Sequence, residues 1–396
     1  MRLALLTPGF SADESDWCVP ALTGLVRELA RVHEVELFAL RYPHQKASYV
    51  AFSARVHALG AAQDGAFGRL ALLARAFACV RRENARAAFD LVHGLWADEA
   101  GFLATAAARA LGMPAVVSLV GGELVGLPSL GYGTALSIAG RTLVRRALRH
   151  ADVVTVGSRE MERLASPHVP ARRLSRLPLG VDTNLFHPSD GGGTAMHLAG
   201  APCILHVASL VPVKDQETLL RALARVAAAT PAAHLHMVGD GPLRRDLERL
   251  AERLGVEPHL TFHGAVAHDR LPAYYRACDL AVLSSRFESQ SMVALEAAAC
   301  GRATVGTAVG VLPELFGQRL TVRVGDDEGL AEAVLALARD PARRTALGEA
   351  SRAAVESRYT LSSSVRQLTR LYTRLVEKRR VLAVTRVAAS SRGRRA

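Results

Sequence analysis

The chain has 396 residues, of which 50% are hydrophobic and 5% aromatic, and it carries a formal net charge of +12 at pH 7. This length is typical of two domains, and the apolar content excludes an intrinsically disordered protein. Five widely spaced cysteines without a CxxC pair exclude a disulfide framework and a structural zinc site. We find no signal peptide and no run of about 18 apolar residues, so we expect a cytoplasmic protein.

Arginine supplies most of the positive charge and gathers in short clusters at 81–82, 145–146, 172–173 and, after Lys378, at 379–380. No DNA- or RNA-binding motif accompanies them, so we expect no nucleic-acid partner. Two interpretations of the clusters stay open. They form a solvated face, or they bring the protein into peripheral contact with an anionic membrane.

In chain order, the first half alternates apolar runs with helically spaced apolar residues. Strands are predicted at 3–7, 35–40, 90–93, 115–119 and 153–156, and helices at 19–31, 70–86 and 99–111. Strands that alternate with helices form parallel βαβ units. The first half therefore predicts a doubly wound α/β domain.

The pattern breaks between 178 and 202, where three consecutive glycines and several prolines predict an interdomain connection. Alternation then resumes, with strands predicted at 204–208, 234–238, 260–263, 280–283 and 303–305 and helices at 216–229, 243–254, 292–299 and over most of 329–378. We expect an N-terminal domain at 1–180, a linker at 181–200, a second domain at 201–365, and a C-terminal helix that crosses back, with a basic tail, at 366–396.

The densest chemical signal is the segment 287–297, which reads FESQSMVALEA. A strand is predicted just before it and a helix opens close to Ser291. Free backbone N–H groups and the positive end of the helix dipole then lie where α/β folds bind anions such as a diphosphate. Glu288 and Glu296 can accept hydrogen bonds from sugar hydroxyls. The alternative interpretation makes them a helix-start carboxylate and a surface charge.

The E-x7-E spacing of Glu288 and Glu296, with Cys300-Gly301 after it, resembles family 4 of the retaining glycosyltransferases, which have the GT-B fold. Further segments match the same family in order: GVD at 180–182, VGDGP at 238–242, FHG at 262–264, ACDL at 277–280 and GVLPE at 310–314. The resemblance is strong over 178–360 and weaker over residues 1–150. It implies two Rossmann-like domains that face a central cleft.

The resemblance implies that the second domain binds a nucleotide-sugar donor, with Lys214 at the phosphates, Glu288 at the sugar ring and Glu296 at the ribose. Ser209 stands where the family usually has an arginine. We expect Glu296 to be an exposed pocket carboxylate that contributes little to stability. The implied donor-binding residues are Ser209, Lys214, Gly239, Gly241, Gly264, Glu288, Ser289, Gln290, Ser291, Met292, Val293 and Glu296.

On the acceptor side, the resemblance implies roles for Gly9, His93, Gly121 and Glu123. Gly9 follows the first strand, and His93 is predicted to end a strand, where it can touch the acceptor. His93 joins Lys214 and Glu288 as an implied catalytic residue. The alternative is a structural histidine whose ring nitrogens are satisfied. Val120 stands where the family often has a histidine that contacts the transferred sugar.

The resemblance therefore implies a retaining transferase that moves a hexose from a nucleoside-diphosphate sugar to a hydroxyl of a sugar or lipid-linked acceptor. Bacterial cell-envelope glycan synthesis is the expected setting, and neither a metal nor another cofactor is expected. Two alternatives stay open. One is a GT-B sugar-phosphate synthase or phosphorylase, and the other is a noncatalytic binding subunit that keeps the fold.

Overall fold

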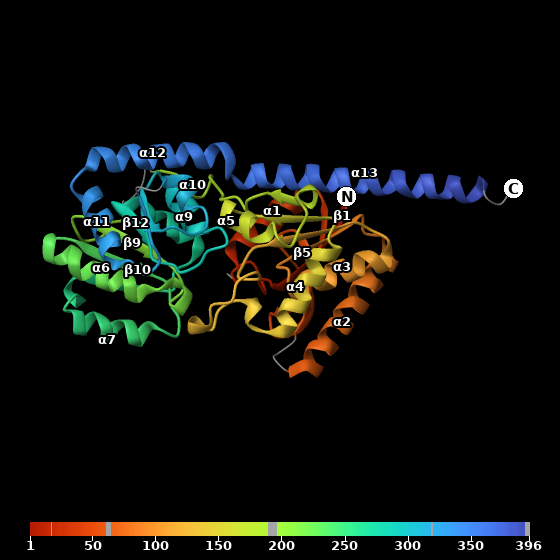
Figure 1. Ribbon diagram of the computed structural model, residues 1–396, viewed down its shortest axis with the longest axis horizontal. Helices are drawn as coiled ribbons and strands as arrows, with labels where there is room; N and C mark the ends of the chain where they lie inside the picture. The colour runs from red at the N-terminus through yellow and green to blue at the C-terminus, as the bar shows by residue number, and fades with distance from the viewer. Residues whose placement is uncertain (17, 61–64, 189–195, 318–319, 393–396) are drawn as a thin grey trace.

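The computed structural model describes residues 1–16, 18–60, 65–188, 196–317 and 320–392, and it describes their side chains except at 66 and 383–392. Two α/β domains lie side by side, and two long helices run along one side of the pair (Figure 1). The expected α/β fold with two parallel-sheet domains is confirmed. The glycine-rich centre of the predicted linker, 189–195, and the last residues of the basic tail, 393–396, lie outside the described residues.

The N-terminal domain contains an eight-stranded sheet in the order β3-β4-β2-β1-β5-β6-β7-β8, parallel except at β3. The strands are β1 (Arg2–Gly9), β2 (Glu34–Tyr42), β3 (Lys46–Ala51), β4 (Ala54–Leu59), β5 (Leu91–Leu95), β6 (Ala115–Leu119), β7 (Val153–Val156) and β8 (Leu174–Arg176). The helices are α1 (Pro20–Ala30), α2 (Gly65–Arg86), α3 (Glu99–Leu111), α4 (Ile138–His150) and α5 (Arg159–Ala165). The strand order reverses between β1 and β5, which is a doubly wound arrangement.

The C-terminal domain contains a six-stranded parallel sheet in the order β11-β10-β9-β12-β13-β14. The strands are β9 (Cys203–Val207), β10 (His234–Val238), β11 (Leu260–Gly264), β12 (Leu280–Leu283), β13 (Thr304–Thr307) and β14 (Thr321–Val322). The helices are α6 (Gln216–Ala229), α7 (Arg244–Leu254), α8 (Leu271–Ala277), α9 (Met292–Ala299), α10 (Leu312–Phe316) and α11 (Asp327–Ala338). This is the 3-2-1-4-5-6 order of a Rossmann fold, and its switch point lies between β9 and β12.

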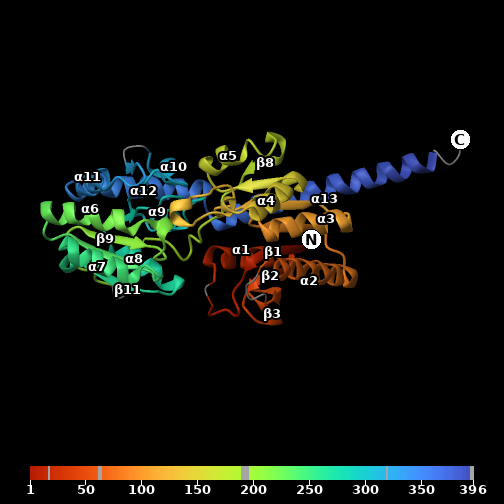
Figure 2. The ribbon, with the colours of Figure 1, turned by 60° about the horizontal axis from the view of Figure 1, so that its bottom comes forward.

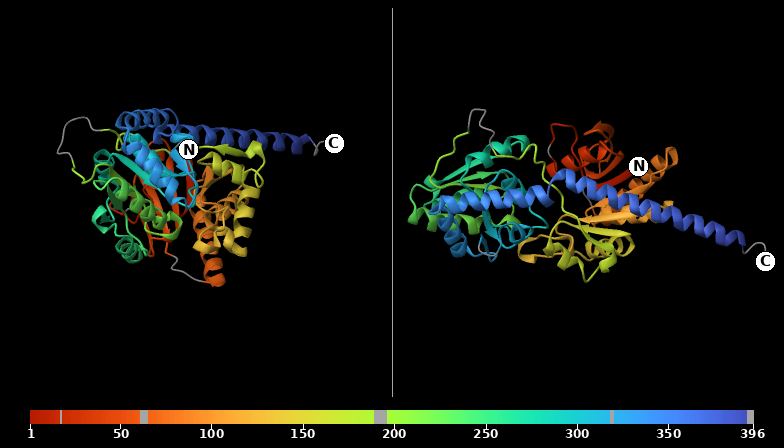
Figure 3. Two further views of the ribbon diagram at one scale, coloured as in Figure 1. Left: turned by 60° about the vertical axis from the view of Figure 1, so that its left-hand side comes forward. Right: turned by 90° about the horizontal axis from the view of Figure 1, so that it is seen from above.

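The last two helices connect the domains. After α12 (Pro341–Arg358) on the C-terminal domain, α13 (Leu361–Arg392) passes to the N-terminal domain (Figures 1 and 3). It begins five residues earlier than the predicted C-terminal helix at 366. Its buried apolar residues share one core with α1 and the N-terminal sheet; they are Leu361, Val365, Leu368, Leu371, Tyr372 and Val376. The end of α13 projects beyond the N-terminal domain.

The β3–β4 hairpin was not predicted from the sequence, and Figure 2 shows it at the outer edge of the N-terminal domain. Its two turn residues, Phe52 and Ser53, have φ angles of +51° and +62°. Such turns usually contain glycine or asparagine, so the sequence lacks the usual signal. None of the helices in the described part of the chain is both long enough and apolar enough to cross a membrane.

Candidate active site

Lys214 and Glu288 meet at the switch point of the C-terminal sheet. Lys214 ends a short 3-10 helix after β9, and Glu288 lies in the loop after β12. Lys214 Nζ donates to Glu288 Oε1 at 2.5 Å, and Ser285 Oγ donates to the same oxygen at 2.7 Å. The pair lines a cavity of about 210 Å³ together with His206 and Ser209. A cation and a carboxylate therefore stand where α/β folds bind their ligands.

Ser291 stands directly before α9 and combines two unfavourable features. Its φ angle is +76°, in the left-handed region that favours glycine. Its side chain is 5% exposed, and within the described residues its Oγ has no hydrogen-bond partner. The first backbone N–H groups of a helix also lack partners within the helix. Strain and unpaired polar groups cluster at ligand sites, so this end of α9 is suited to a diphosphate.

The loop 288–291 lies between the two domains. Ser289 Oγ donates to the Val120 carbonyl at 2.7 Å, and Ser158 Oγ donates to the Ser289 carbonyl at 2.7 Å. Between this loop and the ends of β6, β7 and β8 lies a cavity of about 250 Å³, which we call the interdomain cavity. Lys214 and Glu288 line it from the C-terminal side, so residues of both domains surround the charged pair.

Most of the other predicted donor residues surround this pair. Ser209 lines the smaller cavity, Met292 lines the interdomain cavity, and Val293 lines both. Gln290 lines the interdomain cavity and also holds the chain between the domains, because its Oε1 accepts from the Leu179 backbone N–H at 2.9 Å.

Glu296 is not the exposed carboxylate that we expected from the sequence. It is 5% exposed, and both of its oxygens have protein partners. His268 Nε2 lies 3.0 Å from Oε1, and the hydroxyl of the fully buried Tyr275 donates to Oε2 at 2.9 Å. Glu296 lines a second interdomain pocket of about 250 Å³ with Met292. Met292 thus lies between the pocket of Glu296 and the cavity of Glu288.

The three predicted glycines have a structural explanation. Gly239 N donates to the Gly264 carbonyl at 2.8 Å, and a Cβ at Gly239 would lie 1.9 Å from the Ala208 oxygen. A Cβ at Gly241 would lie 2.5 Å from the Leu210 oxygen. These glycines allow the loops after β9, β10 and β11 to touch, and none of them lines the cavities described above.

The structure does not place His93 at the cleft, which corrects the prediction that it touches the acceptor. Strand β5 continues to Leu95, so His93 lies in its middle and is fully buried. Its Nδ1 lies 2.6 Å from the Tyr372 hydroxyl, and its Nε2 lies 2.7 Å from Ser118 Oγ. Burial lowers the pKa of His93 to about 3. His93 is therefore a neutral histidine with both ring nitrogens satisfied.

The other three residues predicted on the acceptor side also lie outside the described cavities. A Cβ at Gly9 would lie 3.0 Å from Tyr42 Cβ, so Gly9 accommodates the end of β2. Glu123 is 2% exposed and accepts backbone N–H groups, including that of Gly121 at 2.8 Å. Burial raises the pKa of Glu123 to about 7. Gly121 and Glu123 shape the segment 118–123, whose Val120 carbonyl accepts a hydrogen bond from Ser289 Oγ.

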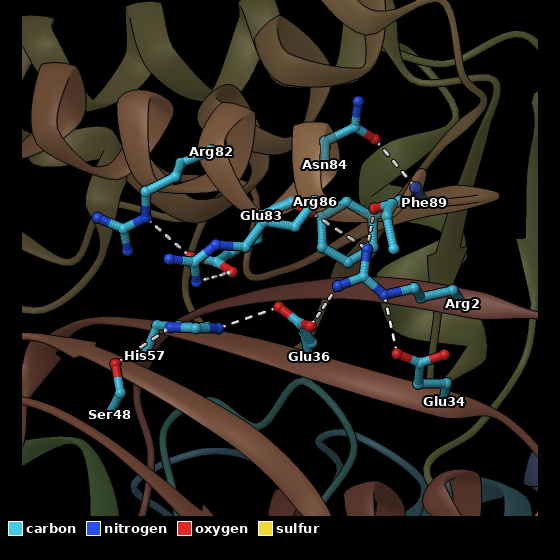
Figure 4. A network of polar contacts seen from close by, with 11 residues as sticks. Arg2, Glu34, Glu36, Ser48, His57, Arg82, Glu83, Asn84, Arg86 and Phe89 are labelled. Carbon is cyan, nitrogen blue, oxygen red and sulfur yellow. Dashed lines mark hydrogen bonds and ion pairs between the residues drawn. The ribbon is translucent and has the colours of Figure 1, made fainter.

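One group among the described residues has metal-ligating atoms within 4.8 Å of one another: His57, Cys79 and Glu83. His57 and Glu83 belong to a buried polar network of the N-terminal domain, which also contains Arg2, Glu36, Arg82 and Arg86 (Figure 4). Arg82 Nε and Arg86 Nη1 each lie 2.8 Å from an oxygen of Glu83. Both oxygens of the Glu83 carboxylate are thus already paired with arginines instead of being available to a metal ion. Arg2 of β1 links this part of α2 to the sheet, because it donates to the Glu83 carbonyl at 3.3 Å and pairs with Glu36 of β2. We interpret the group as part of an ion-pair network that fastens α2 to the sheet.

Three residues of the site were not predicted from the sequence: His268 and Tyr275, which hold Glu296, and Thr155, which lines the interdomain cavity. Tyr275 and Thr155 lie on regular elements whose apolar pattern gives them no distinctive signal. His268 follows the FHG segment at 262–264 by four residues, which is the nearest available hint.

Two family descriptions match the chain. "Glycosyl transferases group 1" matches residues 201–340, and "Glycosyltransferase Family 4" matches residues 21–185. The chain is 36% identical over 235 residues to a GDP-mannose-dependent alpha-(1-6)-phosphatidylinositol monomannoside mannosyltransferase of Mycolicibacterium smegmatis. It is 35% identical over 238 residues to a D-inositol 3-phosphate glycosyltransferase of Geodermatophilus obscurus. Both matches span 56% of this chain, and they span 62% and 49% of the two relatives.

Solved structures resemble the whole fold. Sucrose-phosphate synthase from Thermosynechococcus elongatus has a TM-score of 0.77 at 21% identity, covering 95% of this chain and 99% of that one. HepE of Anabaena, in complex with UDP-glucose, has a TM-score of 0.73 at 20% identity, covering 95% and 100%. The two Rossmann-like domains and the cleft between them define the GT-B class. The chain belongs to the group 1, family 4 glycosyltransferases.

Proposed function

We propose that the protein is a retaining glycosyltransferase that moves a hexose from a nucleoside-diphosphate sugar to an acceptor hydroxyl. The observation that carries this proposal is the Lys214–Glu288 pair beside the N-terminus of α9, which no side chain of the described residues caps. When a donor binds, Lys214 turns from Glu288 to the diphosphate, whose charge grows as the bond to the sugar breaks. Glu288 is then free to hold the sugar ring.

In the proposed reaction the acceptor oxygen bonds to the anomeric carbon on the face that the diphosphate leaves. The departing phosphate oxygen takes the acceptor proton, and no metal takes part. Positioning between the two domains and electrostatic stabilisation supply most of the rate. GDP-mannose is the first donor to test, because the relative at 36% identity carries that donor in its name.

A thermal-shift panel of GDP-mannose, UDP-glucose and ADP-glucose tests the donor, followed by hydrolysis assays with and without EDTA. We expect one nucleotide-sugar to raise the melting temperature and to be hydrolysed slowly, with EDTA making no difference. Glu288→Gln should lower turnover more than donor affinity, since its partner is the reacting sugar. Loss of activity in EDTA that magnesium or manganese restores would contradict the metal-free reaction.

The alternatives predict different results in the same assays. A sugar-phosphate synthase would transfer faster to a sugar phosphate than to the unphosphorylated sugar. A noncatalytic subunit would bind a nucleotide-sugar without hydrolysing it. Binding of none of the three donors would remove the glycosyltransferase proposal.

We further propose that the N-terminal domain docks on anionic membranes, where a lipid-linked acceptor is found. The apolar face of α4 packs on the sheet through Val144, Ala147 and Leu148, which leaves its arginines outside. Large apolar side chains are exposed at the starts of α2 and α4, with Phe67 92% and Ile138 74% exposed. Exposed apolar groups beside basic residues are typical of membrane-surface helices.

Vesicle sedimentation tests the docking. We expect binding to anionic vesicles that falls as salt rises, because salt screens the arginines. Phe67→Ser combined with Leu70→Ser should weaken binding, whereas Val324→Ser, at an exposed site on the C-terminal domain, should not. Absence of binding at low salt would leave the basic clusters as a solvated face.

A further inference from the structure

Four buried side chains form a continuous hydrogen-bonded chain across the N-terminal sheet. The Tyr372 hydroxyl of α13 lies 2.6 Å from His93 Nδ1, and His93 Nε2 lies 2.7 Å from Ser118 Oγ. Ser118 Oγ lies 2.5 Å from Thr155 Oγ1. Tyr372 and His93 are fully buried, and the two hydroxyl residues are 5% and 2% exposed. This series of hydrogen bonds runs from α13 through β5 and β6 to β7.

The direction of these hydrogen bonds follows from counting protons. A neutral histidine has one N–H and one accepting nitrogen. If Tyr372 donates to His93 Nδ1, then Nε2–H donates to Ser118 Oγ. The geometry allows either hydroxyl to donate in the Ser118–Thr155 bond, and we assign the donor role to Ser118, which continues the same direction. The opposite direction would leave the buried Tyr372 proton without an acceptor among the described residues, which is unfavourable. The favoured direction leaves the Thr155 hydroxyl proton unused.

Thr155 and Ser118 both line the interdomain cavity, opposite the loop 288–291. The remaining wall on the N-terminal side is apolar or glycine, with Leu119, Val120, Val156, Gly157, Leu177 and Leu179. Lys214 and Glu288 are the charged residues among the described residues that line it, and the proposed function assigns both of them to the donor. No arginine among the described lining residues is available for a phosphate or carboxylate on a second ligand.

We infer that the Thr155 hydroxyl donates a hydrogen bond to an oxygen of the acceptor, and that the acceptor group entering this cavity is an uncharged, hydroxyl-bearing unit about the size of a monosaccharide. The inference rests on the proposed transferase function. His93, Ser118 and Tyr372 are positioning residues, because they act through Thr155. His93 thus contributes to acceptor binding without touching the acceptor.

Steady-state kinetics on full-length variants test the role of Thr155, with methyl α-D-mannopyranoside and myo-inositol as acceptor probes. Thr155→Val should raise the acceptor KM roughly tenfold, as for the loss of one hydrogen bond, while donor KM and kcat stay nearly unchanged. Thr155→Ser keeps the hydroxyl and should restore the acceptor KM. Tyr372→Phe, which removes the first donor of the chain, should raise the acceptor KM by about threefold.

Each outcome decides a separate point. Unchanged acceptor KM in Thr155→Val would overturn the inference, and a raised donor KM in its place would assign the hydroxyl to the donor sugar. A lower melting temperature without a KM change would make the chain purely structural. Two results would overturn the inference that the acceptor group is uncharged. One is a preference for myo-inositol 1-phosphate over myo-inositol, and the other is hydrolysis of the donor without transfer to either uncharged probe. If the wild-type protein neither binds nor hydrolyses a donor, the proposed function fails instead.

Discussion

The buried polar network of the N-terminal domain and the loop 288–291 are both rich in charged and polar groups, yet they differ in how completely those groups are paired. In the network, Glu36 pairs with Arg2 and His57, and Glu83 pairs with Arg82 and Arg86 (Figure 4). Every oxygen of the two buried carboxylates has a partner. Arg2 also lies over the Phe89 ring, with its guanidinium carbon 4.3 Å from the centroid.

In the loop 288–291, comparable polar groups are only partly hydrogen-bonded among the described residues. Glu288 uses Oε1 for both of its described hydrogen bonds, Ser291 Oγ has none, and the Ser291 backbone is left-handed. A buried polar group without a partner costs free energy. The network therefore serves stability, whereas the loop keeps hydrogen-bonding capacity that a ligand can complete. Substitutions in the two regions should separate these effects.

The largest expected effect is on stability, in the network. Arg2→Met should lower the free energy of unfolding by about 3–5 kcal/mol, because it leaves the buried Glu36 without its arginine. Donor affinity of the folded protein should stay unchanged. Urea unfolding and calorimetry measure the two quantities. Arg82→Met is the matched control, and it should cost at most about 1 kcal/mol since Arg82 is 58% exposed. Equal losses in the two variants would contradict the importance of burial.

Lys214 pairs with Glu288 of this loop, and Lys214→Ala should have the reverse profile. We expect a loss of roughly 2–4 kcal/mol of transition-state stabilisation, the scale for one preorganised charge partner, with little change in melting temperature. Calorimetry should show weaker binding of the nucleoside diphosphate and nearly unchanged binding of the monophosphate. An equal loss for both nucleotides would point to general damage of the pocket.

Glu296 shares features of both regions, so it sharpens the comparison. Glu296→Ala should weaken donor binding and also lower stability by about 1–3 kcal/mol, because the buried Tyr275 hydroxyl loses its acceptor. Glu296→Ala combined with Tyr275→Phe should recover part of the stability and none of the donor affinity. A single variant as stable as the wild type would show that the Tyr275 contact contributes nothing.

The smallest expected effect is a gain. Ser291→Gly should raise stability by about 1 kcal/mol, because it relieves the positive φ and removes an unpaired hydroxyl. The same change should weaken donor binding if that hydroxyl meets the diphosphate. Ser291→Ala keeps the strained backbone and should therefore be less stable than the glycine variant. A glycine variant that melts below the wild type would argue against strain at this position.

The parts of the site that are close in sequence were predictable. Glu288, Ser291 and the start of α9 lie in one segment, and a strand–loop–helix pattern places them at the carboxyl edge of a sheet. His93 was predicted to end a strand, but β5 continues past it to Leu95. The structure shows that Gly94 continues β5 and lets α3 approach, since a Cβ there would lie 2.7 Å from Gly101 Cα.

Contacts between distant segments were not predictable. The bond between Tyr372 and His93 joins residues 279 positions apart, and the one between Ser158 and Ser289 spans 131. No local period records which side chains meet across two domains. The burial of Glu296 has the same cause, because His268 and Tyr275 reach it from 28 and 21 residues away.

The path of α13 limits how this chain can be divided. Its apolar residues, from Leu361 to Val376, complete the core on one face of the N-terminal sheet. A fragment cut at the linker would expose that face and lose the covering helix. A chimera that exchanges the N-terminal half with a relative must therefore exchange α13 as well. The N-terminal domain is therefore one body in space that is built from two separate stretches of the sequence.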